Sequence, residues 1–365
     1  MMHRREFIRS TAAAAVASRL SWIRTTEATL KSKASAKGIL YGSAASVRML
    51  QDQAYQQIFA EQCAILTPEA ELKWNAVHQR PDSYNFGPAD SLLSWCQSHG
   101  LKMRGHTLAF WQSIPSWVPQ MANASNAKDI LTQHIQNVVG HYAGKLQSWD
   151  VVNEAIAPDD HNPQNIRNSI WQQTIGPDYI PLAFNVAHEA DPSAMLVYND
   201  FGVEYDFPGT DVRRNAMLDL LHKLKSQNVP IHAFGLQAHL YGNAVQRMNT
   251  GALTSFLKSV SDMGLKILVT ELDVQDKGLP PDPNARDQAL AQSYGMFLNA
   301  VLRNPNVIVV ETWGLSDKYT WLRQHAPRND GNDVRTLPFD ANMQSKSAVV
   351  QAIEQAFDAA PPRTV

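Results

Sequence analysis

The sequence predicts a single (β/α)8 barrel, a closed sheet of eight parallel strands surrounded by helices. From Ile39 onward, short apolar runs rich in β-branched residues alternate with amphipathic segments of helix length, and eight such pairs can be counted. The alternation continues almost to the C-terminus with no Pro-, Gly- or Ser-rich linker and no short-period repeat. Barrels of this length occur as one domain, so a two-domain division is the weaker interpretation.

The expected strands are short buried runs that end in polar residues. They cover residues 39–44, 64–67, 101–106, 146–154, 194–199, 231–237, 265–271 and 307–313. Helical spacing is clearest at 130–142 and at 290–302, where the second run ends at Asn304-Pro305, and Gly264 suits the end of a helix over 253–263. An open doubly wound sheet would also alternate, but no GxGxxG or GxxxxGK motif follows a strand.

Composition indicates a folded protein without a polyanionic partner. In 365 residues, 32 Lys and Arg against 34 Asp and Glu give a net charge of −2, and 44% of residues are hydrophobic, which excludes a disordered chain. Basic residues cluster only at the N-terminus, so neither nucleic acid nor a membrane is expected as a partner. Cys63 and Cys96 are too few for a disulfide framework or a zinc site, and we expect two buried thiols.

Residues 1–36 are expected to be an export signal followed by a polar tether, with the catalytic barrel over 37–360. HRREFIR at 3–9 precedes the weakly apolar run TAAAAVA at 11–17, a pattern typical of a twin-arginine signal. A bilayer crossing takes about 20 apolar residues, which this run does not reach. We therefore expect a secreted or periplasmic protein. The alternative is that Arg4-Arg5 is an ordinary basic pair at a frayed terminus.

Polar residues at the ends of the expected strands form a candidate active site. In a closed parallel barrel the carboxyl ends of the strands meet at one face, where catalytic residues lie. Six strands end in such residues: Arg104 and His106, Asn153 and Glu154, Asn199 and Asp200, Gln237 and His239, Glu271 and Asp273, and Trp313. Any one of them could be a cap or loop residue, but all six together favour a shared site.

Glu154 and Glu271 provide two carboxylates on different sides of this mouth. Glycoside hydrolysis needs such a pair, because one carboxyl protonates the leaving oxygen while the other, ionised, attacks the sugar. Sugar rings also pack on flat apolar faces. Five tryptophans close to loops could supply these faces: Trp74, Trp111, Trp117, Trp313 and Trp321.

Five ordered motifs then carry a specific resemblance. GHTL at 105–108, WDVVNEA at 149–155, QAH at 237–239, TELDV at 270–274 and WGLSDKYTW at 313–321 resemble those of the glycoside hydrolase family 10 endo-1,4-β-xylanases, over about Lys37 to Phe357. The resemblance implies retaining, double-displacement hydrolysis of xylan, with Glu154 as general acid/base and Glu271 as nucleophile. Retention implies carboxyl groups about 5 to 5.5 Å apart. This chemistry needs no cofactor and no metal.

The resemblance also implies supporting roles around the scissile bond, where the −1 and −2 sugars lie on the glycone side. Asn153 matches a residue that binds the 2-hydroxyl of the −1 sugar. His239 and Asp273 match a pair that keeps Glu271 ionised, the histidine touching the nucleophile and the aspartate orienting the ring. The other matching positions are Gln237 and His106 at the −1 site, Glu69 and Lys73 of TPEAELKW at the −2 sugar, and Asn199, Trp313 and Trp321 around the substrate.

Two positions depart from the family pattern. Ala70 stands where the family's TPENxMKW has asparagine, and a missing polar partner for a sugar hydroxyl costs about 1 to 3 kcal/mol. Ala109-Phe110-Trp111 follows GHTL where the family continues VWH, so a polar histidine is lost. We expect altered glycone recognition rather than a lost reaction. RNDGND at 328–333 has the acidic spacing of a calcium loop but lacks the apolar residue and the Glu that complete an EF-hand loop, so we expect a solvated loop there.

The expected function is therefore that of a monomeric endo-acting xylanase whose partner is xylan or a xylo-oligosaccharide. One alternative keeps the barrel and mechanism but acts on another β-1,4-glycan or on substituted xylo-oligosaccharides. A second alternative is a carbohydrate-binding barrel that has lost catalysis. Activity on a panel of polysaccharides separates these three hypotheses.

Overall fold

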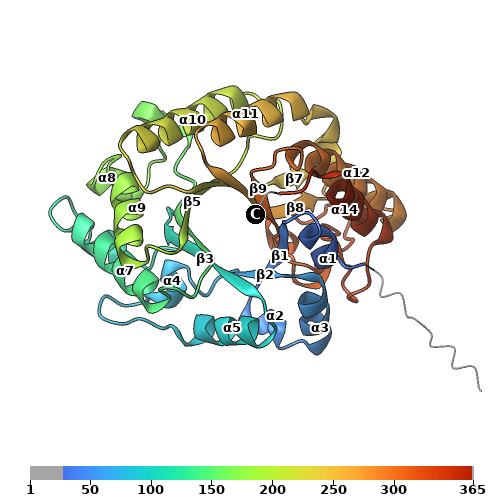
Figure 1. Cartoon of the computed structure of the whole chain (residues 1–365), viewed down its shortest axis with the longest axis horizontal. Helices are drawn as coiled ribbons and strands as arrows, with labels where there is room; N and C mark the ends of the chain where they lie inside the picture. The colour runs from blue at the N-terminus through green and yellow to red at the C-terminus, as the bar shows by residue number, and fades with distance from the viewer. Residues whose placement is uncertain (1–27, 364–365) are drawn as a thin grey trace, which may run out of the picture.

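The computed structural model describes residues 28–363 and forms a closed barrel of eight parallel strands with helices around it (Figure 1). The barrel strands are β1 (Leu40–Ala45), β2 (Ile65–Pro68), β3 (Lys102–Ala109), β4 (Ser148–Asn153), β5 (Met195–Asp200), β6 (Ala233–Leu236), β8 (Lys266–Gln275) and β9 (Val307–Thr312). Each pairs with the next in parallel, and β9 pairs with β1 to close the sheet. The predicted fold class is confirmed, and every expected strand is present within a few residues of its predicted bounds.

A ninth strand, β7 (His239–Tyr241), was not expected. It follows β6 after a break at Ala238, whose φ of 61° lies in the left-handed region. β7 pairs with the distal half of β8, and the register sets His239 opposite Asp273. The extra strand therefore aligns two of the predicted site residues.

Eight longer helices surround the barrel. They are α3 (Gln53–Gln62), α5 (Gly87–Ser98), α7 (Ala127–His141), α9 (Tyr179–Ala190), α10 (Thr210–Ser226), α11 (Thr250–Asp262), α12 (Pro283–Val301) and α14 (Ser347–Ala359). The side chains of Asp52, Asn249 and Asp282 accept hydrogen bonds from first-turn amides of α3, α11 and α12, and these caps fix where the helices begin. The periodic runs at 130–142 and 290–302 belong to α7 and α12.

Short elements lie in the connecting loops. They are the helices α2 (Val47–Leu50), α4 (Trp74–Val77), α6 (Trp117–Met121), α8 (Ile170–Thr174) and α13 (Leu322–His325), and the 3-10 turns η1 (Pro158–Asp160), η2 (Pro163–Asn165), η3 (Gly242–Arg247) and η4 (Asp317–Tyr319). None of the helices between residues 28 and 363 combines the length and apolar character that a membrane crossing requires.

The folded unit begins earlier than Lys37. Helix α1 (Leu30–Ser35), expected to be part of a tether, is capped by Thr29 and buries Leu30 and Ala34 completely. It packs against α14 and β1. Apolar burial therefore makes this segment part of the barrel domain, and the predicted boundary at residue 37 is too late. The predicted export signal lies outside the described residues.

The inside of the barrel changes character along its axis. Ile65, Val197, Ala233, Leu268 and Val309 form a compact apolar cluster inside the barrel. Toward the carboxyl ends of the strands the interior becomes polar and leads to the candidate site. Both cysteines are buried free thiols, as predicted.

Candidate active site

The two predicted catalytic glutamates lie at the carboxyl-terminal face of the barrel. Glu271 is part of β8, and Glu154 directly follows β4. Glu154 has a φ of 55°, in the left-handed region that non-glycine residues rarely adopt. Two hydrogen bonds hold it there, because its amide donates to the Asn199 carbonyl at 2.8 Å and its carbonyl accepts from Arg167 Nε at 2.6 Å.

Glu271 is buried and surrounded by donors. Asn199 Nδ2 donates to Oε1 at 2.8 Å, and His239 Nε2 lies 3.2 Å from Oε2. Burial alone would raise the pKa of Glu271, but the hydrogen bond from His239 and the fields of His106, His239 and Lys73 outweigh it and lower the pKa to about 2. Glu271 is therefore ionised at neutral pH, as a nucleophile requires.

His239 bridges two carboxylates. Its Nδ1 lies 2.9 Å from Asp273 Oδ1, while Trp321 Nε1 donates to Asp273 Oδ2 at 2.7 Å. Burial by itself would lower the pKa of His239, but Asp273 and Glu271 together raise it well above its ordinary value. The histidine thus remains a charged donor to Glu271, and Trp321 fixes the aspartate behind it.

Glu154 has a different environment. Its carboxylate is only partly buried. Oε1 accepts from Gln237 Nε2 at 3.1 Å and from Asn153 Nδ2 at 3.4 Å, and Oε2 accepts from Trp111 Nε1 at 2.8 Å. All three donors are uncharged, so Glu154 lacks the cationic partner that Glu271 has.

A chain of amide groups connects the two carboxylates. Asn199 Nδ2 donates both to Glu271 Oε1 and to Asn153 Oδ1, each at 2.8 Å, and Asn153 in turn reaches Glu154. Gly235 makes room for the Asn199 side chain in the middle of this chain of amides, because a Cβ at position 235 would lie 2.3 Å from Asn199 Oδ1. The glutamates therefore face one small polar gap, an arrangement suited to attack and protonation at a single carbon.

A buried charged network supports the floor of the site. Arg104 pairs with Asp150 and, at 2.9 Å, with Glu311, while His106 Nδ1 lies 2.9 Å from Asp150 Oδ2. The His106 ring meets the edge of Trp313 at 5.2 Å between centroids. Asp150 and Glu311 were not predicted as site residues, although charged residues inside buried strand runs were a usable signal.

The predicted −2 residues lie along the same mouth. Lys73 Nζ lies 5.7 Å from the centre of the Trp313 ring and contributes to the low pKa of Glu271. Burial raises the pKa of Glu69, and Lys73 opposes this rise. Ala70 is exposed, so a longer polar side chain would have room there.

Two of the five candidate tryptophans pack in an aromatic cluster. Trp74 is buried, with its ring stacked on His134 at 3.5 Å between centroids. Trp117 packs against Trp74 and donates from Nε1 to the His78 carbonyl at 3.2 Å. Both belong to an aromatic cluster with His78 and His134, and the buried Trp74 presents no free face to a sugar ring. Trp111, Trp313 and Trp321 do lie around the carboxylates.

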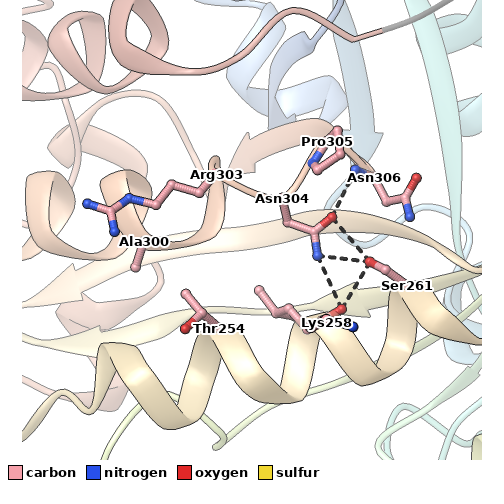
Figure 2. Close-up of a pocket in the computed structure, with 9 residues that line it drawn as sticks. Thr254, Lys258, Ser261, Ala300, Arg303, Asn304, Pro305 and Asn306 are labelled. Atoms are coloured by element: carbon pink, nitrogen blue, oxygen red, sulfur yellow. Dashed lines mark hydrogen bonds between the residues drawn. The ribbon is translucent and has the colours of Figure 1, made fainter.

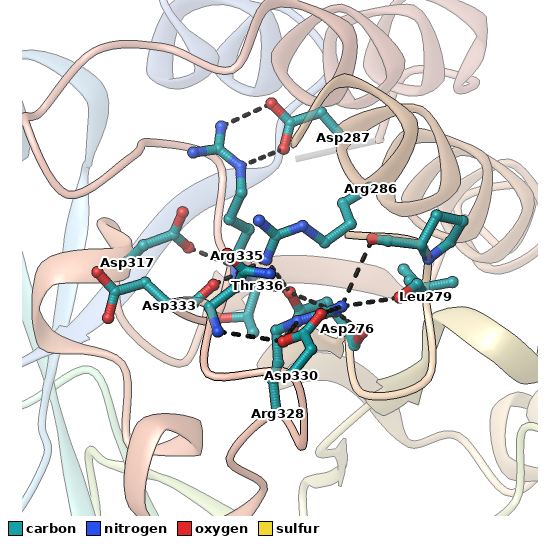
Figure 3. A network of polar contacts seen from close by, with 12 residues as sticks. Asp276, Leu279, Arg286, Asp287, Asp317, Arg328, Asp330, Asp333, Arg335 and Thr336 are labelled. Atoms are coloured by element: carbon teal, nitrogen blue, oxygen red, sulfur yellow. Dashed lines mark hydrogen bonds and ion pairs between the residues drawn. The ribbon is translucent and has the colours of Figure 1, made fainter. Parts of the chain in front are cut away.

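The loop at 328–333 is anchored rather than simply solvated. Arg328 Nη1 donates to the Asp276 carbonyl at 2.6 Å, and Arg328 Nη2 donates to the Leu279 carbonyl at 2.8 Å (Figure 3). Arg286 also pairs with Asp276, at 2.9 Å. The arginines thus occupy the place that a cation would take. Over residues 28–363, no group of three or more His, Cys, Asp or Glu is arranged to hold a metal ion.

A separate hollow of about 310 Å³ lies between α11 and α12, lined by Lys258, Ser261, Arg303 and Asn304 among others (Figure 2). Asn304 Nδ2 donates to Ser261 Oγ at 2.8 Å. Asn304 and its neighbours precede β9, so the hollow lies at the face opposite the glutamates. It presents neither a carboxylate pair nor an aromatic ring, and we do not regard it as a sugar site.

Comparison with known proteins agrees with this geometry. Residues 29–355 match the model of glycosyl hydrolase family 10. The chain is 33% identical over 321 residues to a β-1,4-xylanase of Dictyoglomus thermophilum, covering 85% of this chain and 87% of that protein. It is 32% identical to endo-1,4-β-xylanase B of Thermotoga neapolitana, covering 80% of each.

Solved structures give the same result. Native xylanase 10B of Thermotoga maritima superimposes with a TM-score of 0.80 at 30% identity, covering 90% of this chain and 99% of the other. Xylanase 10B of Thermotoga petrophila, in complex with xylobiose, also gives 0.80, at 29% identity and with coverage of 90% and 97%. The strand-end carboxylates, the family match over nearly the whole fold and these relatives agree, and the chain belongs to glycosyl hydrolase family 10.

Proposed function

We propose that this enzyme is an endo-1,4-β-xylanase that cleaves internal bonds of xylan with retention, using Glu271 as nucleophile and Glu154 as acid/base. The observation that carries the proposal is the contrast between the two carboxylates. Glu271 has a charged donor and a pKa of about 2, whereas Glu154 has only neutral donors and is partly open to solvent. One group is thus suited to attack and the other to exchange a proton.

In the first step, a Glu271 oxygen forms a bond to the anomeric carbon while the bond to the leaving sugar oxygen breaks and that oxygen takes the Glu154 proton. In the second step, ionised Glu154 takes a proton from water, the water oxygen bonds to the anomeric carbon, and the ester to Glu271 breaks. His239 and Asn199 donate to Glu271, so they hold it in line and stabilise its charge when it departs. Asn153 is placed to bind the 2-hydroxyl between the two glutamates.

Two observations support xylan as the substrate: the relatives and the residues around the mouth. Relatives of this chain are named xylanases, and one similar structure carries xylobiose. Lys73, Trp313 and Trp321 lie around the carboxylates as a cation and two aromatic faces for the glycone sugars. Ala70 makes the −2 contact weaker than an asparagine would.

The test is hydrolysis of arabinoxylan, glucuronoxylan, mixed-linkage β-glucan and cellulose, with product sizing and the anomeric form of new ends followed by NMR. We expect xylans to be cleaved to oligosaccharides whose new ends are initially β. Glu271→Ala should abolish turnover, while Glu189→Ala, which changes an exposed glutamate on α9, should not. Near-normal rates in Glu271→Ala, initial α products or a clear preference for glucans would contradict the proposal.

We further propose that the enzyme works outside the cytoplasm. The support is the N-terminal sequence alone, with Arg4-Arg5 followed by Phe7-Ile8 and a weakly apolar run. Cell fractionation of the full chain should find activity outside the cytoplasm, and replacing both arginines with lysine should retain it inside. Export of the double lysine variant at normal levels would argue against a twin-arginine signal.

A further inference from the structure

We propose that Trp111, held by Arg167, is a positioning residue that fixes Oε2 of Glu154 for proton transfer to the leaving sugar oxygen. The inference rests on the proposed function, because it assigns a partner to the proposed acid/base. It concerns a position at which this chain departs from the family motif.

Trp111 is a large apolar residue at the mouth, 38% exposed, so packing in the core does not hold its ring. Its indole nitrogen nevertheless donates to Glu154 Oε2 at 2.8 Å. The other carboxylate oxygen, Oε1, is occupied by the amides of Gln237 and Asn153. Each carboxylate oxygen of Glu154 therefore has its own donors, and Oε2 depends on Trp111.

Arg167 holds both members of this contact. Its guanidinium lies 4.6 Å from the centre of the Trp111 ring, at cation–π distance, and its Nε donates to the Glu154 carbonyl at 2.6 Å. The backbone of Arg167 is itself fixed, because its amide donates to the Ala155 carbonyl at 2.7 Å and Ile166 bridges to Ile156. The loop after β4 thus folds back and clamps the indole against the carboxylate.

The chemistry of the indole fixes which partner donates in the Trp111–Glu154 hydrogen bond. An indole N–H can only donate and does not titrate, whereas a histidine at this position could donate or accept. A carboxylate accepts such a bond more strongly than a neutral carboxylic acid does. The contact therefore holds Oε2 of Glu154 in one direction, and its removal should let the carboxyl group turn away from the leaving oxygen.

Other charges near Glu154 come from several elements. The charge of Glu154 acts on Asp200 at the end of β5, and Asp200 lies 3.7 Å from Arg213 of α10. Arg167 comes from the loop after β4. Glu271 on β8 and His239 on β7 connect to Glu154 through the amide chain. A Trp111→Phe substitution leaves all of these groups in place, so its effect isolates the indole N–H.

The test compares wild type, Trp111→Phe and Trp95→Phe by kcat/KM on xylotetraose and on 2,4-dinitrophenyl β-xylobioside. Trp95 lies on α5 and packs against His99 and Phe59, away from the glutamates, which makes it a matched control. In Trp111→Phe we expect kcat/KM for xylotetraose to fall about fivefold to tenfold. The activated aryl substrate needs little proton donation, so its kcat/KM should hardly change.

Arg167→Met keeps an unbranched stem but removes the cation and the N–H, and it should lower kcat/KM for xylotetraose with the same selectivity. An unchanged kcat/KM for xylotetraose in Trp111→Phe, an equal loss with both substrates or an equal loss in Trp95→Phe would overturn the inference. An unchanged kcat/KM for xylotetraose in Arg167→Met would overturn the part played by Arg167. Failure of the wild type to cleave xylotetraose would overturn the proposed function itself, together with this inference.

Discussion

Replacement of His239 by alanine tests how the enzyme keeps its nucleophile ionised. The wild-type pKa of Glu271 is about 2 against an ordinary value of 4.5, although burial by itself would raise it. That difference corresponds to about 3 kcal/mol in favour of the ionised form. His239 supplies the hydrogen bond and part of the positive charge that oppose burial, and His106 and Lys73 supply further charge.

In His239→Ala the burial remains while the strongest opposing contact is lost, so the Glu271 pKa should rise by about one to two units. The assay is the acid limb of kcat/KM for a dinitrophenyl xylobioside, because this substrate makes little demand on Glu154 and the limb then reports Glu271. Protonated Glu271 cannot attack, so activity in the variant should fall away at a correspondingly higher pH.

His141→Ala is the matched control, since His141 pairs at 2.8 Å with Asp90 on the helical surface, away from the glutamates. Its acid limb should coincide with that of the wild type. An acid limb in His239→Ala that stays at the wild-type position would mean that Glu271 does not depend on the imidazolium for its charge, contrary to this prediction.

Three further substitutions probe the acid/base, the −2 contact and the amide chain. Glu154→Ala should slow xylan cleavage by about 10²- to 10⁴-fold but slow activated aryl xylobiosides far less, and equal losses would argue against proton donation. Ala70→Asn should lower KM for xylo-oligosaccharides about fivefold, near 1 kcal/mol, and an unchanged KM would mean that no sugar hydroxyl lies within reach. Gly235→Ala should displace Asn199, reduce kcat at least tenfold and lower stability by about 1 to 3 kcal/mol. Gly140→Ala has open space around its new methyl group and should leave kcat unchanged. A fully active Gly235→Ala would show that the site tolerates a displaced Asn199.

Much of the fold and the position of the glutamates follow from local pattern. Buried parallel strands read as continuous apolar runs, so the residues that interrupt them mark the strand ends, and Glu154 and Glu271 are found this way. The same reasoning could have found Asp150 and Glu311, which lie inside such runs but face the barrel interior.

The features that escaped prediction depend on tertiary contacts of loops. β7 exists because the chain turns at Ala238 and then pairs with the far end of β8. The hydrophobic periodicity of the sequence does not predict this turn. The burial of Trp74 depends on its stacking with His134, which is distant in sequence. Arg167 reaches Glu154 only because an irregular loop folds back, and the spacing between these residues gives no sign of it.

In the proposed mechanism one buried glutamate, Glu271, attacks the sugar and carries it covalently between the two steps. Incubation with a 2-deoxy-2-fluoro xylobioside that has a good leaving group, followed by peptide mass spectrometry, measures this directly. We expect a single fluoroglycosyl ester on Glu271, formed in step with loss of activity. A label on any other residue, or inactivation without a covalent adduct, would contradict it.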